Sequence, residues 1–271
     1  MKTVSCVEAV YFSPTRTTEK IVGTIAQALA DKLQVNLQKR SFTLPGERKE
    51  ALTFQKDHLV VLGVPVYAGR VPNILLKYLR QLEGNGALGI PVVVYGNRNY
   101  DDALIELRDL MENGHLHTIA AAAFIGEHSF SRILGAGRPD AEDLAKAQHF
   151  AWNAANNIQD EHMEPIAVQG YEPYRPYYIP KAPDGQHKVI SKVLPKVNEK
   201  CVKCGTCAAV CPMGSISPED FSSYTGICIK CGACIKLCPQ GARYYDDPTY
   251  LYHKENLEKE YTRRAEPELF L

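Results

Sequence analysis

The 271-residue sequence carries no net charge, because its 31 lysines and arginines are balanced by 31 aspartates and glutamates. This composition argues against the strong positive field through which many proteins bind nucleic acid or anionic membranes. Long apolar runs are also missing, since the longest, residues 59–69, is far shorter than the roughly 20 residues of a membrane-spanning helix. Glu8 interrupts the apolar stretch at the N-terminus and no cleavage site follows, so we expect no signal peptide and a soluble, cytoplasmic protein.

Two nucleotide-binding motifs are absent from the sequence. Without GxxxxGK(S/T) it does not indicate a P-loop NTPase, and without GxGxxG it does not indicate a Rossmann dinucleotide site. Cysteine is almost absent from the first 200 residues: only Cys6 occurs there, within an expected strand, and we interpret it as a small buried apolar residue. The other eight cysteines lie between Cys201 and Cys238, which predicts two parts of different chemistry.

Residues 1–160 alternate between short β-rich runs and amphipathic helical patterns. Some of the runs are apolar throughout, which is typical of strands buried on both faces. Five strands that alternate with helices predict an α/β domain with a parallel sheet and helices on both faces. The expected strands cover residues 4–12, 35–37, 59–64, 91–95 and 119–125, and the expected helices cover residues 17–33, 73–82, 101–111 and 140–157.

The clustered cysteines form two copies of the motif CxxCxxCxxxCP, offset by 27 residues from Cys201 to Cys228. The copies also share Lys203 with Lys230, Gly205 with Gly232, and Gly214 with Gly241, which indicates an internal duplication. Three thiolates at three-residue intervals lie on one tight loop and can each bind a different iron of a cubane, while the fourth iron takes its ligand from the other motif. We therefore expect two [4Fe-4S] clusters, one held by Cys201, Cys204, Cys207 and Cys238, and the other by Cys228, Cys231, Cys234 and Cys211.

Zinc and disulfides are the alternatives for these cysteines. A four-ligand zinc site uses two CxxC pairs and has no use for a third cysteine or for the fourth that precedes proline. Disulfides do not persist in a reducing cytoplasm. Both alternatives therefore fit the pattern less well than iron–sulfur clusters.

The duplicated motif resembles that of the bacterial two-[4Fe-4S] ferredoxins over residues 199–244. The resemblance implies a small α+β domain, assigned here to residues 197–245, that shuttles single electrons at low potential. A unit of about 50 residues has little core of its own, and its clusters replace that core. Because such clusters are usually damaged by oxygen, an anaerobic source is expected.

The first expected strand runs into a segment rich in hydroxyl groups and then directly into a helix. The side chains of Ser13, Thr15, Thr17 and Thr18 can each bond a phosphate oxygen. Backbone N–H groups and the dipole at the helix N-terminus also favour a negative charge there. The segment therefore predicts a monophosphate site, with ordinary N-capping by Thr15 or Thr17 as the alternative.

This segment resembles the phosphate loop of flavodoxins, which bind FMN, and the resemblance covers about residues 1–160. It implies a doubly wound, parallel five-stranded sheet of order 2-1-3-4-5, with FMN at the switch between the first and third strands. Arg16 stands where flavodoxin loops usually have glycine, so its role is open.

Two further loops, after the third and fourth strands, hold the flavin ring in this family. Tyr67 and Tyr100 are the candidates to stack on the ring, with packing as the alternative for both. The backbone of residues 96–99 would meet the pyrimidine edge. The FMN-binding residues that the resemblance implies are Ser13, Thr15, Arg16, Thr17, Thr18, Pro65, Val66, Tyr67, Ala68, Gly69, Gly96, Asn97, Arg98, Asn99, Tyr100 and Asp101.

Three segments lie outside these motifs. Residues 161–196 are rich in proline and tyrosine, which predicts an extended segment packed on the protein surface rather than a mobile spacer. Residues 246–271 are expected to form a wrapping arm or a terminal helix. The loop after the fifth strand contains His128, which is either a proton donor or substrate contact beside the flavin, or an ordinary polar loop residue.

The whole chain thus looks like a flavodoxin–ferredoxin fusion flavoprotein, in which FMN links one-electron and two-electron partners. This implies an FMN-dependent oxidoreductase that exchanges electrons with an external ferredoxin-like carrier, with a small molecule as a further candidate acceptor and no assigned catalytic residue. The alternatives are a pure electron carrier, or a cluster-based redox sensor without flavin. Residues 197–246 have five basic and four acidic side chains, so the main partner of this unit is expected to be its own flavin domain.

Overall fold

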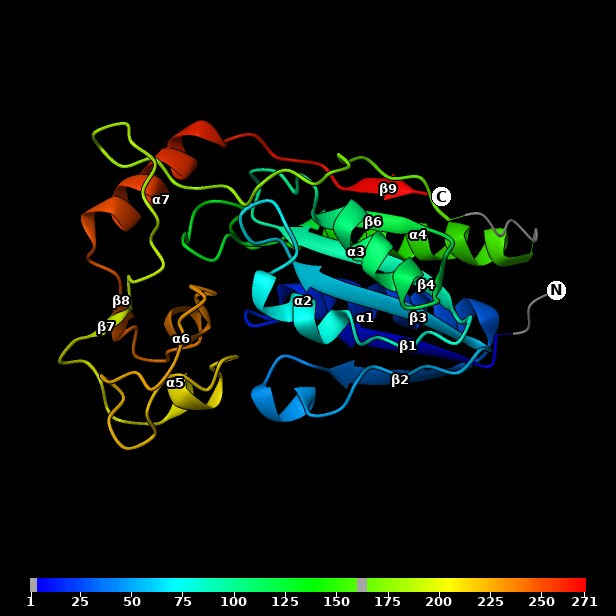
Figure 1. The fold of residues 1–271 in the computed structure, drawn as a ribbon, viewed down its shortest axis with the longest axis horizontal. Helices are drawn as coiled ribbons and strands as arrows, with labels where there is room; N and C mark the ends of the chain where they lie inside the picture. Colours follow the sequence, from blue (N-terminus) through cyan, green and yellow to red (C-terminus); the bar gives the residue numbers. More distant parts are fainter. Residues whose placement is uncertain (1–3, 160–164) are drawn as a thin grey trace.

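The computed structural model describes residues 4–159 and 165–271. Figure 1 shows a sheet domain beside a smaller cysteine-rich unit, which lies beyond the ends of the central strands. The strands are β1 (Cys6–Tyr11), β2 (Asn36–Ser41), β3 (His58–Pro65), β4 (Leu88–Tyr95), β5 (His117–Thr118), β6 (Ala121–Ile125), β7 (Lys196–Val197), β8 (Arg243–Tyr244) and β9 (Glu268–Phe270). The helices are α1 (Thr17–Leu33), the short 3-10 helix η1 (Pro45–Arg48), α2 (Asn73–Leu79), α3 (Ala103–Asn113), α4 (Ala141–Gln159), α5 (Thr206–Ala209), α6 (Ala233–Lys236) and α7 (Pro248–Glu260).

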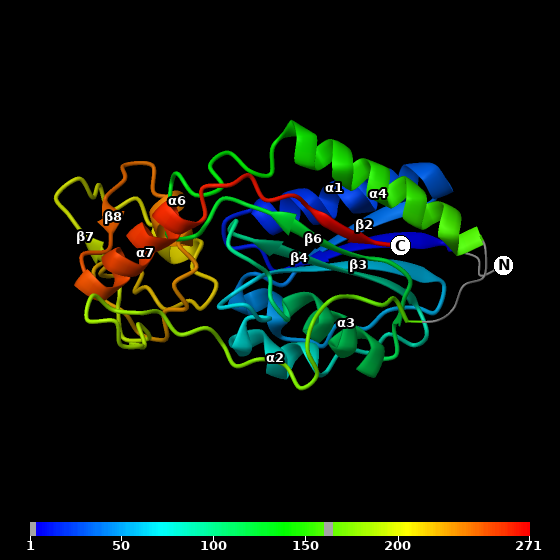
Figure 2. The ribbon, with the colours of Figure 1, turned by 90° about the horizontal axis from the view of Figure 1, so that it is seen from above.

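The central sheet has the strand order β2-β1-β3-β4-β6, and all of these strands are parallel. This is the predicted order 2-1-3-4-5, in which β6 is the fifth predicted strand. The order in which the chain adds strands to the sheet reverses between β1 and β3. Helices α1 and α4 cover one face of the sheet, and α2 and α3 cover the other (Figure 2). Apart from His58 at the start of β3, strands β3 and β4 are apolar, as is typical of strands buried on both faces. The predicted flavodoxin-like fold is therefore confirmed.

The structure adds to the central sheet two short strands that the sequence did not predict. The two residues of β5 pair with β4, and β9 pairs antiparallel with β6, so that Ala121 lies opposite Phe270. Strands of two or three residues are too short to show an alternating pattern. The tail is both a helix, α7, and an arm that returns to the sheet domain and ends in β9 (Figure 1).

The proline- and tyrosine-rich segment packs on the sheet domain as predicted. Its described part begins at residue 165, and the predicted boundary between residues 160 and 161 lies outside the described residues. The hydroxyl of Tyr177 donates to the carbonyl of Val71 at 2.7 Å. Arg175 binds the buried carboxylate of Asp102 through its backbone N–H and its guanidinium. These contacts hold the segment against α3 and the loop before α2.

Asn97 anchors the returning tail. Its side-chain nitrogen donates to the carbonyls of Tyr261 and Arg263, each at 2.8 Å, and its oxygen accepts from the N–H of Ala265 at 3.2 Å. The side chain is almost fully buried. It therefore satisfies backbone groups of the tail that would otherwise be buried without a partner.

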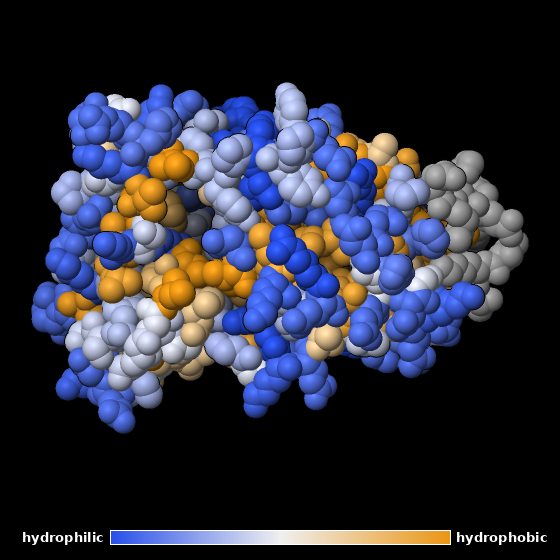
Figure 3. Space-filling view, in the orientation of Figure 1, coloured by the Kyte–Doolittle hydropathy of each residue, from blue (hydrophilic) through white to orange (hydrophobic). Residues whose placement is uncertain are grey.

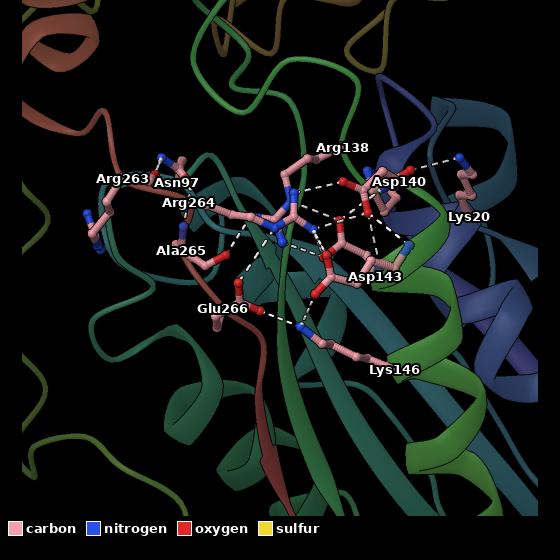
Figure 4. Close-up of polar contacts among 12 residues, drawn as sticks. Lys20, Asn97, Arg138, Asp140, Asp143, Lys146, Arg263, Arg264, Ala265 and Glu266 are labelled. Carbon is pink, nitrogen blue, oxygen red and sulfur yellow. Dashed lines mark hydrogen bonds and ion pairs between the residues drawn. The ribbon is translucent and has the colours of Figure 1, made fainter.

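A second anchor involves buried charges (Figure 4). Arg138 forms a bidentate ion pair with Asp143, and both side chains are buried. Arg138 also donates to the carbonyl of Ala265 at 2.5 Å, while Arg264 pairs with Asp140 at the surface. The tail therefore completes a polar network whose other members belong to the sheet domain. Among the described helices, none has the length and apolar character needed to cross a membrane.

The two copies of the cysteine motif have the same backbone. Lys203 and Lys230 have φ angles of 55° and 56°, and Gly205 and Gly232 have φ angles of 79° and 75°. Strands β7 and β8, which flank the two motifs in the sequence, pair antiparallel. The predicted internal duplication is thus present in conformation as well as in sequence.

Candidate functional site

The loops after β1, β3, β4 and β6 meet at the carboxyl edge of the sheet, where the cysteine-rich unit lies against them. They enclose a cavity of about 50 Å³, which we call the loop cavity. Thr15, Thr17 and Thr18 line it from the first loop, and Gly96 and Gly126 line it from the others. The structure therefore brings together the predicted phosphate-binding hydroxyls and the loops of the neighbouring strands.

Ser13 and Arg16 belong to the first loop but are not among the residues that line the loop cavity. The hydroxyl of Ser13 accepts a hydrogen bond from the N–H of Glu19 at 2.9 Å and so satisfies one N–H of the first turn of α1, while the N-cap residue, Arg16, makes no side-chain cap hydrogen bond. Arg16 is exposed and has a φ angle of 66°, which is the left-handed conformation. Glycine adopts this conformation without steric cost, which explains why flavodoxin loops usually have glycine at this position.

A larger cavity of about 200 Å³ adjoins the loop cavity and lies between the two parts of the molecule. We call it the interdomain cavity. Tyr67 and His128 line both cavities. Figure 3 shows apolar side chains gathered along the boundary between the sheet domain and the cysteine-rich unit. The lining of the interdomain cavity combines the sheet domain, the connecting segment, the cysteine-rich unit and α7, represented by Phe130, Tyr178, Ile229 and His253.

The two tyrosines predicted to stack on a flavin have different surroundings. Tyr67 lines both cavities, and burial raises its pKa well above the ordinary value. Tyr100 is buried in the core, where its hydroxyl donates to Glu268 of β9 at 2.6 Å and its ring lies 5.7 Å from that of Tyr95. Tyr100 therefore has a packing role, which was the alternative interpretation, while Tyr67 lies at the candidate site.

Of the remaining residues predicted to hold the flavin ring, some line the cavities and others do not. Pro65 and Val66 line the loop cavity, and Ala68 and Arg98 line the interdomain cavity. Asn97 instead points into the tail, as described above. The other predicted residues, Gly69, Asn99 and Asp101, are not among the residues that line these two cavities, although Asp101 forms an ion pair with Arg98.

Most residues that line the interdomain cavity are not among the predicted site residues, and Phe130, Tyr178, Ile229 and His253 are four of them. They come from four separate segments, and no local pattern in the sequence indicates that those segments meet. The one available signal was the density of aromatic side chains in the connecting segment and the tail, which indicated packing but not a location.

His128 is a neutral imidazole at neutral pH. Burial, with repulsion from His253, Lys236 and Arg98, lowers its pKa to about 3. Its Nδ1 accepts a hydrogen bond from the backbone N–H of Phe130 at 3.1 Å, so the single ring proton resides on Nε2. His128 can therefore donate a hydrogen bond within the site, but it does not act as an imidazolium acid at neutral pH.

This environment predicts a loss of stability in acid. Because the folded pKa of His128 lies below the ordinary 6.5, its neutral form contributes full stability above pH 6.5, and that contribution declines as the pH falls toward 3. His253, whose pKa burial lowers to about 4, adds to the same decline. We expect His128→Gln to reduce the dependence of the free energy of unfolding on pH by up to about 1.4 kcal/mol per pH unit below pH 6.5. Unfolding curves recorded across this pH range measure that free energy. The exposed His149→Gln is the control, and an unchanged slope in His128→Gln would contradict the prediction.

The eight clustered cysteines line two separate cavities in the predicted groups. The first cysteine cavity is lined by Cys201, Cys204, Cys207 and Cys238. The second cysteine cavity is lined by Cys211, Cys228, Cys231 and Cys234. Each group contains three cysteines of one motif and the fourth of the other, which is the crossed arrangement of a two-cluster unit. None of the nine cysteines, all of which are described, forms a disulfide.

A backbone N–H group is directed at one sulfur atom in each cysteine cavity. The N–H of Ser215 donates to the sulfur of Cys211 at 3.4 Å, and the N–H of Ala242 donates to Cys238 at 3.3 Å, at equivalent positions of the two copies. Arg243 lines the first cysteine cavity, and its buried Nε has no hydrogen-bond partner among the described residues. An iron–sulfur cluster would offer acceptors to such donors.

No three or more His, Cys, Asp or Glu side chains of residues 4–159 and 165–271 are placed to hold a single metal ion. A [4Fe-4S] cluster differs from such a site because its four cysteines bind four separate irons. The donor set and the cavity lining fit the cluster that the motif predicts.

Cys231 lies where the cysteine-rich unit meets the sheet domain. It lines both the second cysteine cavity and the loop cavity, and only 9% of its surface is exposed. Burial raises the pKa of this thiol well above its ordinary value. The second group of cysteines therefore lies directly beside the loops predicted to bind phosphate and flavin.

Contacts between the two parts fix this arrangement. The ammonium of Lys236 pairs with the carboxylate of Glu127 and donates to the carbonyl of Ser131. The ring of Phe130 lies 4.7 Å from that of Tyr250 in α7. Both sides of the interface thus contribute charged and aromatic contacts around the cavities.

Residues 200–243 match the sequence model of a family described as a 4Fe-4S dicluster domain, and all eight cysteines of the two motifs fall within the match. The chain joins a flavodoxin-like domain to a 4Fe-4S dicluster-type domain. The parallel strand order assigns the first of these folds, and the motif match assigns the second. We refer to them below as the flavodoxin-like domain and the dicluster domain.

Solved structures with some likeness to the chain include a flavodoxin from the domain Archaea (16% identity, 57% of this chain and 99% of that chain, TM-score 0.40). A flavodoxin of Streptococcus pneumonia TIGR4 has 19% identity over 56% of this chain and 99% of its own, with a TM-score of 0.39. A structure described as flavone reductase has 10% identity over 66% of this chain and 68% of its own, with a TM-score of 0.42. No curated protein matches the chain.

Proposed function

We propose that this chain is an iron–sulfur flavoprotein that transfers electrons between an external one-electron carrier, two [4Fe-4S] clusters and FMN. The two groups of cysteines would hold the clusters, and the hydroxyls of Thr15, Thr17 and Thr18 would hold the phosphate of FMN. Tyr67 and the backbone beside Gly96 would lie against the rest of the cofactor. A flavin supplies one- and two-electron chemistry, and a cluster supplies one-electron chemistry.

The observation that carries this proposal is the position of Cys231. One side chain lines both the cavity of the second cysteine group and the cavity of the phosphate-type loop. Two cofactors held in these cavities would be neighbours, as electron transfer between them requires. A dicluster domain that merely shared a chain with a flavodoxin-like domain would not need a cluster ligand at that cavity.

The protein supplies burial and fixed hydrogen-bond donors to the two sites. Apolar side chains form much of the lining of the interdomain cavity, and His128, whose neutral ring carries its proton on Nε2, is also part of that lining. In the dicluster domain, N–H groups directed at Cys211 and Cys238 stabilise negative charge on sulfur. Burial and hydrogen bonding of this kind are the means by which a protein adjusts reduction potentials.

The test is anaerobic reconstitution of the full chain with iron, sulfide and FMN, followed by counts of iron and flavin, an absorption spectrum and an EPR spectrum of the reduced protein. We expect about eight irons and one flavin per chain. Protein that binds neither iron nor flavin would overturn the proposal. Protein that is replete in iron but resists FMN would support a cluster-based redox sensor instead.

A second candidate function, a pure electron carrier, is favoured by the size of the interdomain cavity. Its volume of about 200 Å³ is smaller than the roughly 300–1,000 Å³ of most ligand pockets. A flavin ring would occupy much of it. Anaerobic turnover with quinones, nitro compounds and enones distinguishes the two functions, since a carrier would give slow rates that do not saturate with acceptor.

A further inference from the structure

The two copies of the cysteine motif share a backbone but not an environment. In the second copy, Ile229 is partly buried, and Lys230 and Cys231 are each only 9% exposed. In the first copy, the equivalent Val202 is 63% exposed, and Lys203 and Cys204 are also exposed. The same short surface is therefore covered in one copy and open in the other. We call the covered surface the inner face; it consists of Ile229, Lys230, Cys231 and Gly232. We call the open surface the outer face; it consists of Val202, Lys203, Cys204 and Gly205.

The inner face shows what such a surface contacts. Ile229 lines the interdomain cavity, and Cys231 lines the loop cavity. A methyl group built on Gly232 would lie 2.5 Å from the carbonyl oxygen of Ser129, so the absence of a side chain allows the two backbones to meet. The inner face is thus seated on the proposed redox site of another domain, with an apolar side chain at its centre and a close backbone contact.

The outer face has the same features and no covering segment among the described residues. A methyl group built on Gly205 would meet its nearest neighbour, the ring edge of Phe221, only at 3.8 Å. Cys204 and Gly205 both line the first cysteine cavity, as Cys231 and Gly232 line the second. The outer face therefore brings the first cysteine group to the molecular surface.

We infer that the outer face is the docking site for a small one-electron carrier protein whose redox centre lies at its own surface. The inference rests on the proposed function and adds the place where the external partner binds. By the symmetry of the duplication, the outer face would meet the carrier as the inner face meets the flavodoxin-like domain. On docking, the reduced carrier loses one electron and this protein gains it, and no bond is made or broken.

The charges around the outer face indicate apolar rather than electrostatic docking. Hydrogen bonds from Ser222 lower the pKa of Asp220, with a smaller contribution from the charge of Lys203, and Lys200 is adjacent to Glu199 in the sequence. Neither sign of charge dominates around the exposed Val202. We therefore expect binding of the carrier to change little with ionic strength, unlike docking steered by opposite charges.

The test uses the reconstituted full chain and an oxidised bacterial two-[4Fe-4S] ferredoxin as the probe, with binding measured by calorimetry. Val202→Glu places a charge at the centre of the outer face, and we expect it to weaken binding by about tenfold or more. It should slow reduction by the reduced ferredoxin to a similar extent, while reduction by dithionite is unchanged. The matched control is Val189→Glu, at an exposed valine of the connecting segment, which should behave as wild type.

Other outcomes would overturn the inference. Ile227→Glu places the same charge at an exposed side chain beside the second cysteine group, and selective weakening by this variant would move the docking site there. Wild-type protein that is reduced by dithionite but neither binds nor accepts electrons from ferredoxin would refute docking while leaving the proposed function intact. Self-association of the wild type, abolished by Val202→Glu, would assign the outer face to a second copy of this chain. If Val202→Glu loses iron, Lys203→Glu replaces it in the same measurements.

Discussion

Replacing Cys231 with serine is expected to remove about half of the iron and to uncouple the remaining cluster from the flavin. Cys231 belongs to the second cysteine group and also lines the loop cavity, so its loss removes the cluster that would lie next to FMN. The flavin should remain bound, because the threonine hydroxyls of the first loop are unchanged. Iron and flavin counts with EPR of the reduced protein measure the first effect, and stopped-flow absorbance measures the second.

The matched control is Cys204→Ser, the equivalent cysteine of the first copy. It should also remove about half of the iron, but the cluster beside the flavin should remain. Dithionite should then reduce that cluster and the flavin together in Cys204→Ser, whereas Cys231→Ser should retain only the distant cluster. Equal coupling of cluster and flavin in the two variants would contradict the placement of Cys231 between the cofactors. Loss of all iron in Cys231→Ser alone would show that the second cluster holds the dicluster domain together.

Gly232→Ala is expected to push the dicluster domain away from the flavodoxin-like domain. Its φ angle of 75° imposes a cost of about 1 kcal/mol on any residue with a Cβ. The added methyl group would also lie 2.5 Å from the carbonyl oxygen of Ser129, and a backbone atom cannot move aside as the end of a side chain can. Overpacking of this kind costs about 1–3 kcal/mol, so the interface should open and electron exchange with the flavin should slow.

Gly205→Ala separates the two contributions. Its φ angle of 79° gives the same backbone strain, but its methyl group would only make an ordinary contact with Phe221. We expect both variants to lower the midpoint of anaerobic thermal unfolding, with the larger shift in Gly232→Ala. Only Gly232→Ala should slow the exchange of electrons with the flavin. Equal effects of the two variants on that rate would mean that the contact with Ser129 does not set the distance between the domains.

Much of the fold follows from the sequence, because the signals that define it are local. Residues 59–64 and 91–95 are continuous apolar runs, and they form the two central strands β3 and β4. The spacing of the cysteines defines the dicluster motif without any reference to tertiary structure. The crossed grouping of Cys211 and Cys238 was predictable because the motif carries its own chemistry, and the lining of the two cysteine cavities matches it.

The rest depends on contacts between distant segments. Tyr100 and Asn97 lie in a loop that the flavodoxin resemblance assigned to the flavin, yet both make hydrogen bonds with the returning tail. Nothing in residues 96–101 indicates this, because their partners are more than 160 positions away, and only Glu268, the partner of Tyr100, belongs to a strand, which has three residues. The interdomain cavity is likewise formed by four segments whose meeting has no local signature.

Strand β9 makes the dicluster domain an insertion in the flavodoxin-like domain rather than an appendage to it. The chain leaves the sheet after α4, passes through the dicluster domain and α7, and returns to pair with β6. During synthesis, the sheet therefore remains with an unpaired edge at β6 until the cysteine motifs have already been made. Since exposed sheet edges promote aggregation, a fragment that ends after α4 would leave β6 open to pairing with other chains. Because β9 follows the cysteine motifs in the sequence, the sheet is completed only after the segment that would hold the clusters has been synthesised.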